Sequence, residues 1–534
     1  FPGPFQQFGM AWYALVPLFV LLRFATPREG FRLGFAFGLG FWLCSIAWLM
    51  TLRNNGGPVA LVAFGLVGLS TWCSLFAGLF GCAAAALWRG GDSVADGWRR
   101  SVFEAWRPAA AALMWCGAEY LRSTLLTGFA WNALGVSMVG LPFLATGGGG
   151  LDAGGARLVQ RTMLPVVQLA SLGGVYAVSF PIALMNGALA GVAVRLYRSA
   201  RRSPFATRRH LDLVLALAMM IVAMGWGAWR VKRLRAEDAA APTVNIAAVN
   251  PSMPCVFEAN DADWDAAYAA LWLDTRTVAM FKPDLTVWPE TVLYDNMPSP
   301  EMEAAMLAFA AELGAPVLAG GTVTATNAAG ALVVYNGSFL FGTHGVVDGV
   351  YRKQHLVPFG EFIPFDKTLT FLQRLAPAGV SCTPGSGPVV MPIAGGRARV
   401  SPLICFEDTV AGLSRSAVRA GADILIAQSN DAWFRGSAEP AQHHAQAVFR
   451  AVENRVPLVR SSNQGVSAVV TAYGASAEDA GGGFFAQPVP LPMHPGATLY
   501  ARAGDWVFGI PCAVLLLGVA GWQLRSRAGD ASRG

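Results

Sequence analysis

The sequence predicts a multi-span α-helical membrane bundle joined to an α/β domain outside the membrane. Three observations support this prediction. Hydrophobic residues make up 54% of the 534 residues and charged residues only 13%, whereas soluble proteins contain about 25% charged residues. Most of residues 1–230 consists of apolar runs separated by short arginine-rich breaks. Residues 231–504, in contrast, have the composition of an ordinary soluble domain.

The apolar runs predict where the chain crosses the membrane, since a spanning helix needs about 20 apolar residues. We expect seven spans, at residues 8–24, 33–52, 59–87, 103–121, 170–194, 211–230 and 505–523. The first run is short, and the fourth contains Glu119 and begins near Arg107. The expected domains are therefore a membrane bundle over 1–230, an outer domain over 231–504, and a last span with its tail over 505–534.

The arginines predict which side of the membrane each loop faces, because cytoplasmic loops collect basic residues. With seven spans, sixteen arginines fall on one side and only four on the other before the polar domain. The polar domain is therefore expected outside the cytoplasm. Arg230, Lys232, Arg233 and Arg235 go against this bias, but long domains are translocated largely regardless of charge. Because this arrangement puts the N-terminus outside and Phe1 is not an initiator methionine, we expect that an upstream span is missing.

Charge distribution and cysteine content argue against nucleic-acid binding and against a structural zinc site. The net charge is +6, but the arginines flank apolar runs and do not form a basic face interleaved with aromatic residues, so no nucleic-acid binding is predicted. The eight cysteines contain no C-x-x-C pair, and His443 and His444 are adjacent, so no structural zinc site is predicted. Whether Cys255 and Cys382 form a disulfide stays open. The glycine-rich stretch 145–156 is expected to be a loop.

The polar domain alternates between two kinds of segment. Short β-rich runs lie at 243–249, 284–289, 315–321, 398–404, 422–428 and 456–462. Helix-like stretches lie at 262–280, 301–313, 409–420 and 437–454. Such alternation indicates an α/β domain with stacked sheets or one largely buried sheet.

Three places in this domain contain residues suited to chemistry. Glu290 ends the apolar run DLTVWP, Arg352 and Lys353 lie in YRKQHLVPFGEFIPF with Glu361 close behind, and Cys405 ends a strand in ICFED. Taken alone, each has an ordinary explanation. Glu290 could be a helix cap or surface acid, Arg352 and Lys353 a solvated basic pair, and Cys405 an inert thiol. The carboxyl ends of strands are nevertheless where α/β proteins present reacting groups.

Together these residues predict nucleophilic catalysis by a cysteine. A thiol reacts well only when a base or cation favours its thiolate. Glu290 can serve as that base, and the compact ammonium of Lys353 can stabilise both a thiolate and a tetrahedral oxyanion. The backbone N–H of Phe406, next after Cys405, is a candidate second oxyanion donor.

The order of WPE, YRKQHLVPFGEFIPF and ICFE resembles the nitrilase or carbon–nitrogen hydrolase superfamily with its Glu-Lys-Cys triad. The long PFGEF-x-P block, joined to a bundle of spans and one C-terminal span, is similar more narrowly to the apolipoprotein N-acyltransferase family. The segments LTGFAWN (126–132) and RSSNQGVSAVVTAYG (460–474) are also similar to that family. This resemblance implies a nitrilase-like αββα sandwich and eight spans, of which the first is absent here.

The resemblance also implies a role for each residue. Glu290 becomes the general base, Lys353 the orienting and oxyanion-stabilising cation, and Cys405 the nucleophile. Glu361 becomes a supporting acid near the lysine. The pair that follows the cysteine is Phe406 and Glu407, where the family usually has Tyr-Glu, so no hydroxyl is available at position 406. A tryptophan of a mobile loop in the family has no assigned match, although Trp264 is near its place.

The implied activity is acyl transfer through a Cys405 thioester. The implied donor is a membrane phospholipid, and the acceptor is the α-amine of the N-terminal diacylglyceryl-cysteine of an apolipoprotein. No cofactor or metal is implied. The expected setting is a monomer in the bacterial inner (plasma) membrane, with the catalytic domain on the periplasmic side.

Three alternatives remain at the level of the sequence. A membrane-tethered nitrilase-like amidase would pass the acyl group to water. A transporter with a binding domain is disfavoured because the spans contain few ionisable residues besides Glu119. A papain-like Cys-His pair would use His355.

Overall fold

The computed structural model describes residues 8–89, 98–139, 161–200, 210–254, 260–297, 299–326, 330, 332–364, 381–478 and 483–531. Within it the chain forms two units. The membrane unit comprises Phe1–Met50, Val59–Lys232 and Arg502–Gly534, and the α/β unit comprises Thr51–Pro58 and Arg233–Ala501. The α/β unit therefore includes a short segment that lies in sequence between two helices of the membrane unit.

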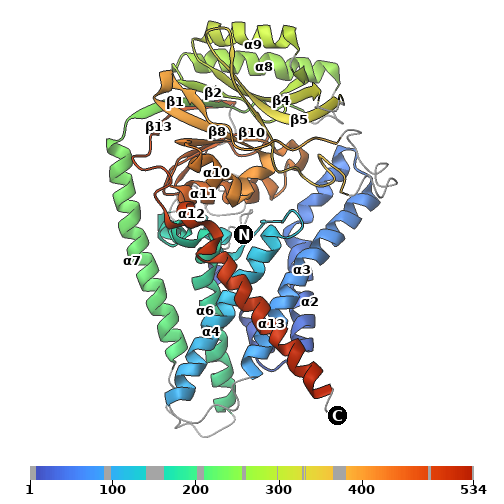
Figure 1. Cartoon of the computed structure of the whole chain (residues 1–534), viewed down its shortest axis with the longest axis vertical. Coiled ribbons are helices and arrows are strands. Elements are labelled where there is room, and N and C mark those ends of the chain that lie inside the picture. Colours follow the sequence, from blue (N-terminus) through green and yellow to red (C-terminus); the bar gives the residue numbers. More distant parts are fainter. Residues whose placement is uncertain are drawn as a thin grey trace. The chain divides into compact units, whose positions relative to one another are not determined.

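The long helices of the first unit follow the apolar runs (Figure 1). They are α1 Val16–Leu22, α2 Pro27–Ser45, α3 Val59–Arg89, α4 Trp98–Thr124, α6 Ala170–Ala200, α7 Leu211–Ala240 and α13 Gly509–Ala531. Shorter helical turns are η1 Phe8–Trp12, η2 Ala47–Asn55, η3 Leu134–Met138, α12 Leu499–Ala503 and η9 Gly504–Trp506.

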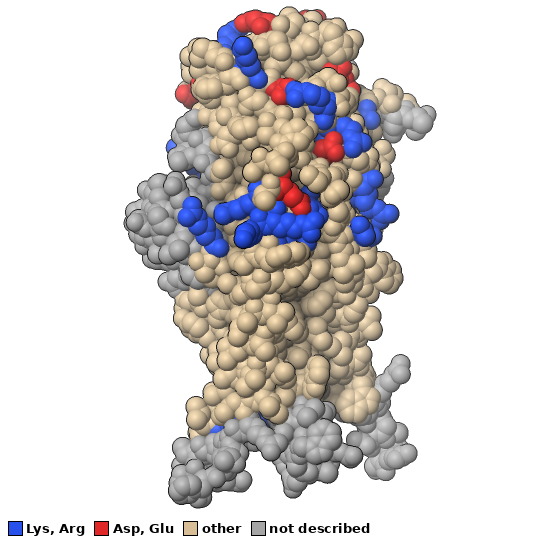
Figure 2. All heavy atoms as spheres, turned by 90° about the vertical axis from the view of Figure 1, so that its left-hand side faces the viewer, with Lys and Arg blue, Asp and Glu red and all other residues tan. Residues whose placement is uncertain are grey.

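Five helical segments among the described residues are long and apolar enough to cross a membrane. They are Pro27–Asn55, Val59–Arg89, Ala170–Tyr197, Leu211–Ala240 and Leu499–Gln523, and each contains one of the seven expected spans. The two other expected spans coincide with the short helix α1 and with α4, which is long but contains several charged residues. On the face that Figure 2 shows, a long stretch of helical surface has no charged side chain, as contact with lipid requires, and basic side chains gather in a band.

Glycines bring α2 and α3 into close contact. Gly30, Gly34 and Gly38 repeat every four residues, so they lie on one face of α2. A Cβ atom on Gly34 would lie 2.2 Å from the carbonyl oxygen of Ala77, and one on Gly30 would lie 2.4 Å from that of Gly81. Small residues at this spacing are a common device for packing membrane helices backbone to backbone.

The α/β unit contains two sheets. The first has the order β13-β1-β2-β4-β5-β6, with β3 also paired to β4. Its strands are β1 Thr243–Val249, β2 Leu285–Val287, β3 Leu293–Met297, β4 Val317–Thr326, β5 Leu332–Phe341, β6 Val347–Arg352 and β13 Phe484–Pro490. Strands β1, β2 and β4 are parallel neighbours. Strand β13 pairs antiparallel with β1, and β5 pairs antiparallel with both β4 and β6.

The second sheet has the order β12-β11-β10-β9-β8-β7. Its strands are β7 Met391–Ile393, β8 Ala398–Ile404, β9 Ile424–Asn430, β10 Leu458–Asn463, β11 Ala468–Val470 and β12 Ser476–Glu478. Its central strands β8, β9 and β10 are parallel. The helices of the unit are α8 Asp261–Ala279, α9 Pro300–Leu313, α10 Ala411–Arg419 and α11 Glu439–Asn454, with the 3-10 turns η6 Ala394–Gly396, η7 Cys405–Thr409 and η8 Asp431–Phe434.

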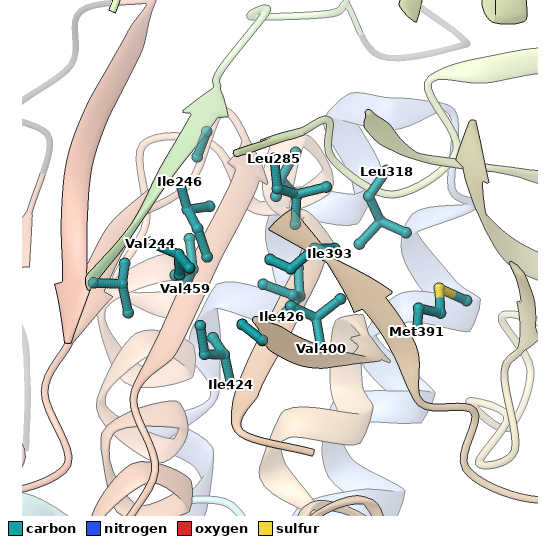
Figure 3. Packing of buried hydrophobic residues seen from close by; sticks show 14 of the residues in the cluster. Val244, Ile246, Leu285, Leu318, Met391, Ile393, Val400, Ile424, Ile426 and Val459 are labelled. Carbon is teal, nitrogen blue, oxygen red and sulfur yellow. The ribbon is translucent and has the colours of Figure 1, made fainter. Parts of the chain in front are cut away.

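Apolar side chains from both sheets form one buried core between them (Figure 3). Ile246 and Leu285 of the first sheet belong to the same cluster as Val400 and Ile426 of the second. Helices α8 and α9 contact the first sheet, and α10 and α11 contact the second. The layers are therefore helix, sheet, sheet, helix, which confirms the predicted αββα sandwich, and the other unit is the predicted helical membrane bundle.

Candidate active site

The three residues expected to react each follow the end of a strand. Lys353 comes directly after β6 and Cys405 directly after β8, and Glu290 lies three residues beyond β2. The strand ends of the two sheets thus deliver side chains from well-separated parts of the sequence to loops, the usual place for reacting groups in α/β folds.

Lys353 is buried between two carboxylates. Its side chain is 1% exposed, and its Nζ lies 2.9 Å from Oε1 of Glu361 and 3.4 Å from Oε1 of Glu290. Burial opposes the charge of the ammonium group, but Glu361 and Glu290 outweigh it and raise the pKa of Lys353 well above its usual value. The group is therefore a permanent cation in this site.

Backbone and amide donors fix the two carboxylates. The Nδ2 group of Asn336 donates to Oε1 of Glu290 and to Oε1 of Glu361, at 2.8 Å each. The second oxygen of Glu290 accepts from the N–H of Asn430 at 3.1 Å, and that of Glu361 from the N–H of Val357 at 2.9 Å. Burial would raise the pKa of Glu361, but Lys353 and these donors lower it. Both acids are thus held in one orientation.

Asn336 was missed by the sequence analysis, although it touches both acids. It lies in the middle of β5, in the run LVVYNGSFLF, and is 8% exposed. A buried polar residue inside an apolar strand must find a hydrogen-bond partner, and this was the available signal.

Cys405 has a backbone conformation that is unusual for a residue with a side chain. Its φ is +52°, in the left-handed region, which is costly for L-residues and is found mainly at functional sites. The residue is half-buried. Burial first, and the Glu290 carboxylate second, raise the pKa of the Cys405 thiol well above its usual value against the opposing effect of Lys353. At rest the sulfur therefore keeps its proton.

Glu407 connects the strand that precedes Lys353 with the strand that precedes Cys405. It is fully buried, and its Oε2 accepts from Tyr351 Oη and Ile404 N, both at 2.8 Å. Its Oε1 accepts from the N–H groups of Gln354 at 2.6 Å and His355 at 3.0 Å. Burial raises the pKa of Glu407. These contacts fix the loop after β6 and the turn η7 relative to each other.

Phe406 packs against His355, the residue of the alternative Cys-His pair. The two rings are stacked with centroids 5.7 Å apart. Among the residues that the structure describes, Nε2 of His355 has no hydrogen-bond partner. Burial, and then Lys353, lower the pKa of His355. The imidazole is therefore neutral and is not paired with the Cys405 thiol.

A pocket opens beside Glu290. Its lining combines apolar residues, among them two tryptophans, with polar ones: Met253, Pro254, Trp264, Glu290, Thr291, Val292, Asn430, Ala432, Trp433 and Asn463. The carbonyl oxygen of Trp433 accepts hydrogen bonds from Nδ2 of Asn55 at 2.8 Å and from Oγ1 of Thr51 at 3.3 Å. The segment 51–58 thus supports the pocket wall, which the sequence analysis did not foresee.

Two further expectations concern cysteines and metals. Cys382 is a free thiol in this structure, and Cys255 lies outside the described residues, as does the stretch 145–156. Asp431, Glu439 and His443 approach one another closely enough to hold a metal ion. The guanidinium of Arg460, however, contacts both Asp431 and His443 and already supplies positive charge there.

Comparisons with known proteins cover nearly all of the chain. A family model described as the apolipoprotein N-acyltransferase N-terminal domain matches residues 1–150, and a carbon-nitrogen hydrolase model matches residues 245–480. An apolipoprotein N-acyltransferase of Azotobacter vinelandii is 31% identical over 548 residues, covering 100% of this chain and 94% of its own. One of Geobacter metallireducens is 30% identical over 481 residues, covering 89% of this chain and 83% of its own.

A solved structure, that of Saccharomyces cerevisiae Nit3 of the nitrilase superfamily, covers 46% of this chain and 90% of its own, with 20% identity and a TM-score of 0.34. The family resemblance inferred from WPE, PFGEF-x-P and ICFE is confirmed by the family models and by the identity of the bacterial relatives. The chain therefore belongs to the apolipoprotein N-acyltransferase family.

Proposed function

We propose that this protein transfers an acyl chain from a membrane phospholipid, through a thioester on Cys405, to the α-amine of the N-terminal diacylglyceryl-cysteine of an apolipoprotein. The observation that supports this mechanism most is the cluster in which the buried Lys353 ammonium contacts the carboxylates of Glu290 and Glu361. It combines a fixed carboxylate with a permanent cation, as base and oxyanion site require.

In the first half-reaction, the Cys405 sulfur attacks the ester carbonyl of the phospholipid. Because the thiol is protonated at rest, Glu290 accepts its proton as the sulfur–carbon bond forms. The Lys353 ammonium and the N–H of Phe406 stabilise the oxyanion. The ester carbon–oxygen bond then breaks, Glu290 returns the proton to the departing oxygen, and lysophospholipid leaves an acyl-thioester.

In the second half-reaction, the lone pair of the acceptor α-amine attacks the thioester carbonyl. Glu290 takes a proton from the amine, the carbon–sulfur bond breaks, and the proton goes back to the Cys405 sulfur. The product is an amide, and the enzyme is restored. One oxyanion site serves both halves, which is the advantage of a covalent intermediate.

Glu361 has a distinct task in this scheme. It is the nearer partner of Lys353, at 2.9 Å against 3.4 Å for Glu290. The ammonium is thus neutralised mainly by Glu361, and Glu290 keeps its capacity to accept a proton. The pocket beside Glu290, with Trp264 and Trp433 in its wall, is where we propose that the substrate approaches the base.

The test is the intact mass of the protein after incubation with phospholipid alone. We expect one added acyl chain, released by neutral hydroxylamine and absent in Cys405→Ala. A diacylglyceryl-cysteine peptide with a free α-amine should then receive the chain as an amide, whereas the same peptide with an acetylated amine should not. Discharge to water regardless of peptide would identify an amidase or hydrolase instead.

We further propose that the protein acts as a monomer in the bacterial inner membrane with its α/β unit on the periplasmic side, from the arginine distribution. Thr343 is exposed in the turn between β5 and β6. A cysteine placed there should react with an impermeant maleimide in cells whose outer membrane alone is permeabilised. If this cysteine reacts only after the inner membrane is broken, the α/β unit lies on the cytoplasmic side and the proposed topology is wrong.

A further inference from the structure

Four buried ionisable side chains outside the proposed reacting groups form a closed cluster, here called the ion quartet: Asp408, Asp431, His443 and Arg460. Each is at most 1% exposed. They come from four elements, since Asp408 lies in η7, Asp431 in η8, His443 in α11 and Arg460 in β10. Nothing in the proposed mechanism uses them directly.

Each cation of the quartet contacts both carboxylates. Arg460 donates through Nη1 to Asp408 and through Nη2 to Oδ2 of Asp431, the latter at 3.0 Å. His443 places Nε2 3.0 Å from Oδ1 of Asp408 and Nδ1 3.1 Å from Oδ1 of Asp431. Arg460 Nη2 also lies 2.9 Å from His443 Nδ1. With two cations and two anions, the quartet is neutral as a whole when the imidazole is protonated.

The protonation states agree with this charge balance. Burial and Arg460 oppose a charge on His443, but Asp408 and Asp431 outweigh them and raise its pKa to about 10. Burial, followed by Asp431, raises the pKa of the neighbouring Glu439 well above its usual value. Glu439 is therefore neutral, although its Oε1 lies 3.4 Å from His443 Nδ1.

The quartet joins the two loops that must cooperate in catalysis. Asp408 lies three residues after Cys405, within the same turn η7. Asp431 directly follows Asn430, whose N–H donates to Glu290 at 3.1 Å. Arg460 therefore connects the turn of the nucleophile with the turn that holds the base, through contacts at both ends.

We propose that Arg460 is a positioning residue that, through Asp408 and Asp431, fixes the turn of Cys405 relative to the turn that holds Glu290. This inference rests on the proposed function. A buried ion pair is a weak source of net stability compared with apolar residues of the same volume, but a displacement of about 1 Å between reacting groups can cost about a hundredfold in rate. The quartet therefore acts on the rate of Cys405 acylation.

The milder test uses two adjacent serines of β10. Ser462 Oγ donates to Oδ2 of Asp431 at 2.9 Å, whereas Ser461 Oγ donates to the carbonyl oxygen of Val249 at 3.0 Å and does not touch the quartet. Both serines are buried. Ser462→Ala should lower the single-turnover rate of Cys405 acylation about fivefold, the effect of one lost hydrogen bond of about 1 kcal/mol, without changing KM for phospholipid. Ser461→Ala should keep the rate within about twofold.

The stronger test compares two buried arginines. Arg460→Lys keeps the charge, but one ammonium cannot replace the fork that reaches both carboxylates. Arg450 is the control: it is 2% exposed, pairs with Glu453 at 3.0 Å and donates to the carbonyl oxygen of Thr409 in η7 at 3.4 Å. It thus reaches the turn of Cys405 but, among the described residues, makes no contact with Asp431, so it does not connect the two turns. Arg460→Lys should lower the acylation rate about a hundredfold with KM unchanged. Arg450→Lys should lower Tm without a comparable loss of rate.

Several outcomes would overturn the inference. If Ser462→Ala acylates at the wild-type rate, or if rates in all four variants simply follow their Tm, the quartet stabilises the fold and does not position the reacting groups. The serine pair decides the matter even if Arg460→Lys does not fold. If wild-type Cys405 itself is never acylated by phospholipid, the proposed function fails first, and that result is distinct from a negative result with the variants.

Discussion

Lys353 and Glu361 form the closest ion pair among the described residues of the candidate active site, with 2.9 Å between Nζ and Oε1. This pair separates two tasks that a single carboxylate could not perform together. In the proposed mechanism, Glu361 compensates the charge of the buried ammonium, and Glu290, held at 3.4 Å from the same Nζ, accepts the proton.

Removal of either the base or the cation should abolish most turnover while the protein stays folded. Glu290→Gln and Lys353→Met should each reduce acylation about 10²–10³-fold, the usual contribution of general base or oxyanion stabilisation. Single-turnover acylation of Cys405, with Tm as the check on folding, measures this. His355→Ala is the control and should cost far less, because its ring only stacks on Phe406. A comparable loss in that variant would revive the Cys-His mechanism.

Replacing Glu290 should raise the rate at which Cys405 is alkylated, although it lowers the rate at which Cys405 is acylated. Burial and then the Glu290 carboxylate raise the thiol pKa, so the thiolate fraction stays small at neutral pH. The iodoacetamide rate, followed by mass, should rise with pH well beyond the ordinary thiol pKa of about 8.5. Glu290→Gln removes one of the raising charges and should therefore be alkylated faster at pH 8, although its acylation is lost. A plateau near pH 7 in the wild type would instead indicate a preformed thiolate.

The charge on His443 should make stability depend on pH in the alkaline range. Its pKa is raised to about 10 in the folded protein, against about 6.5 when unfolded. A raised pKa contributes stability that is fully present below the unfolded value and is lost as pH rises through the folded value. The groups that face it are Asp408, Asp431, Glu439 and Arg460.

The measurement is Tm of wild type and His443→Gln at several pH values. The difference between the two should be largest near pH 6 and should shrink between about pH 6.5 and 10, as the wild-type imidazole loses its proton. A difference that stays constant over this range would mean that the imidazole is neutral throughout and that the quartet has a net negative charge.

The segment 51–58, which begins inside η2, should affect substrate binding more than chemistry. Asn55 is 7% exposed and donates to the carbonyl oxygen of Trp433, which lines the pocket beside Glu290. Asn55→Ala should raise KM for phospholipid several-fold, in line with about 1 kcal/mol for a lost hydrogen bond, and leave kcat nearly unchanged. Thr51→Val, which loses the longer bond of 3.3 Å, should have a smaller effect. Equal kcat losses in both variants would contradict this assignment.

The sequence predicted those parts of the molecule whose signals are local. Apolar runs located the long helices, and the strand runs at 243–249, 398–404 and 422–428 coincide with β1, β8 and β9. Strand β13, with the run FFAQPVP, was not foreseen. It lies at the edge of its sheet, beside β1 alone, where proline is tolerated, so its composition did not indicate a strand.

Only those residues of the candidate site that stand at strand ends could be predicted from the sequence. Glu290, Lys353 and Cys405 stand at strand ends within recognisable motifs, so a single sequence was enough to select them. Asn336 and Arg460 lie inside strands, and their roles depend on which strand pairs with which and on residues tens of positions away. Such long-range pairings have no local periodicity, and the left-handed backbone of Cys405 likewise results from the surrounding contacts and not from residue type.

The inclusion of residues 51–58 in the α/β unit has a consequence for exchanging parts between relatives. A chimera that takes residues 1–230 from one relative and the remaining chain from another would combine the Trp433 loop of one protein with the Asn55 loop of the other. Transplanting residues 51–58 together with the α/β unit should preserve the native pairing. The natural boundary for recombination in this chain is thus discontinuous, because the short segment 51–58 between two membrane helices has to be inherited with the α/β unit far along the chain.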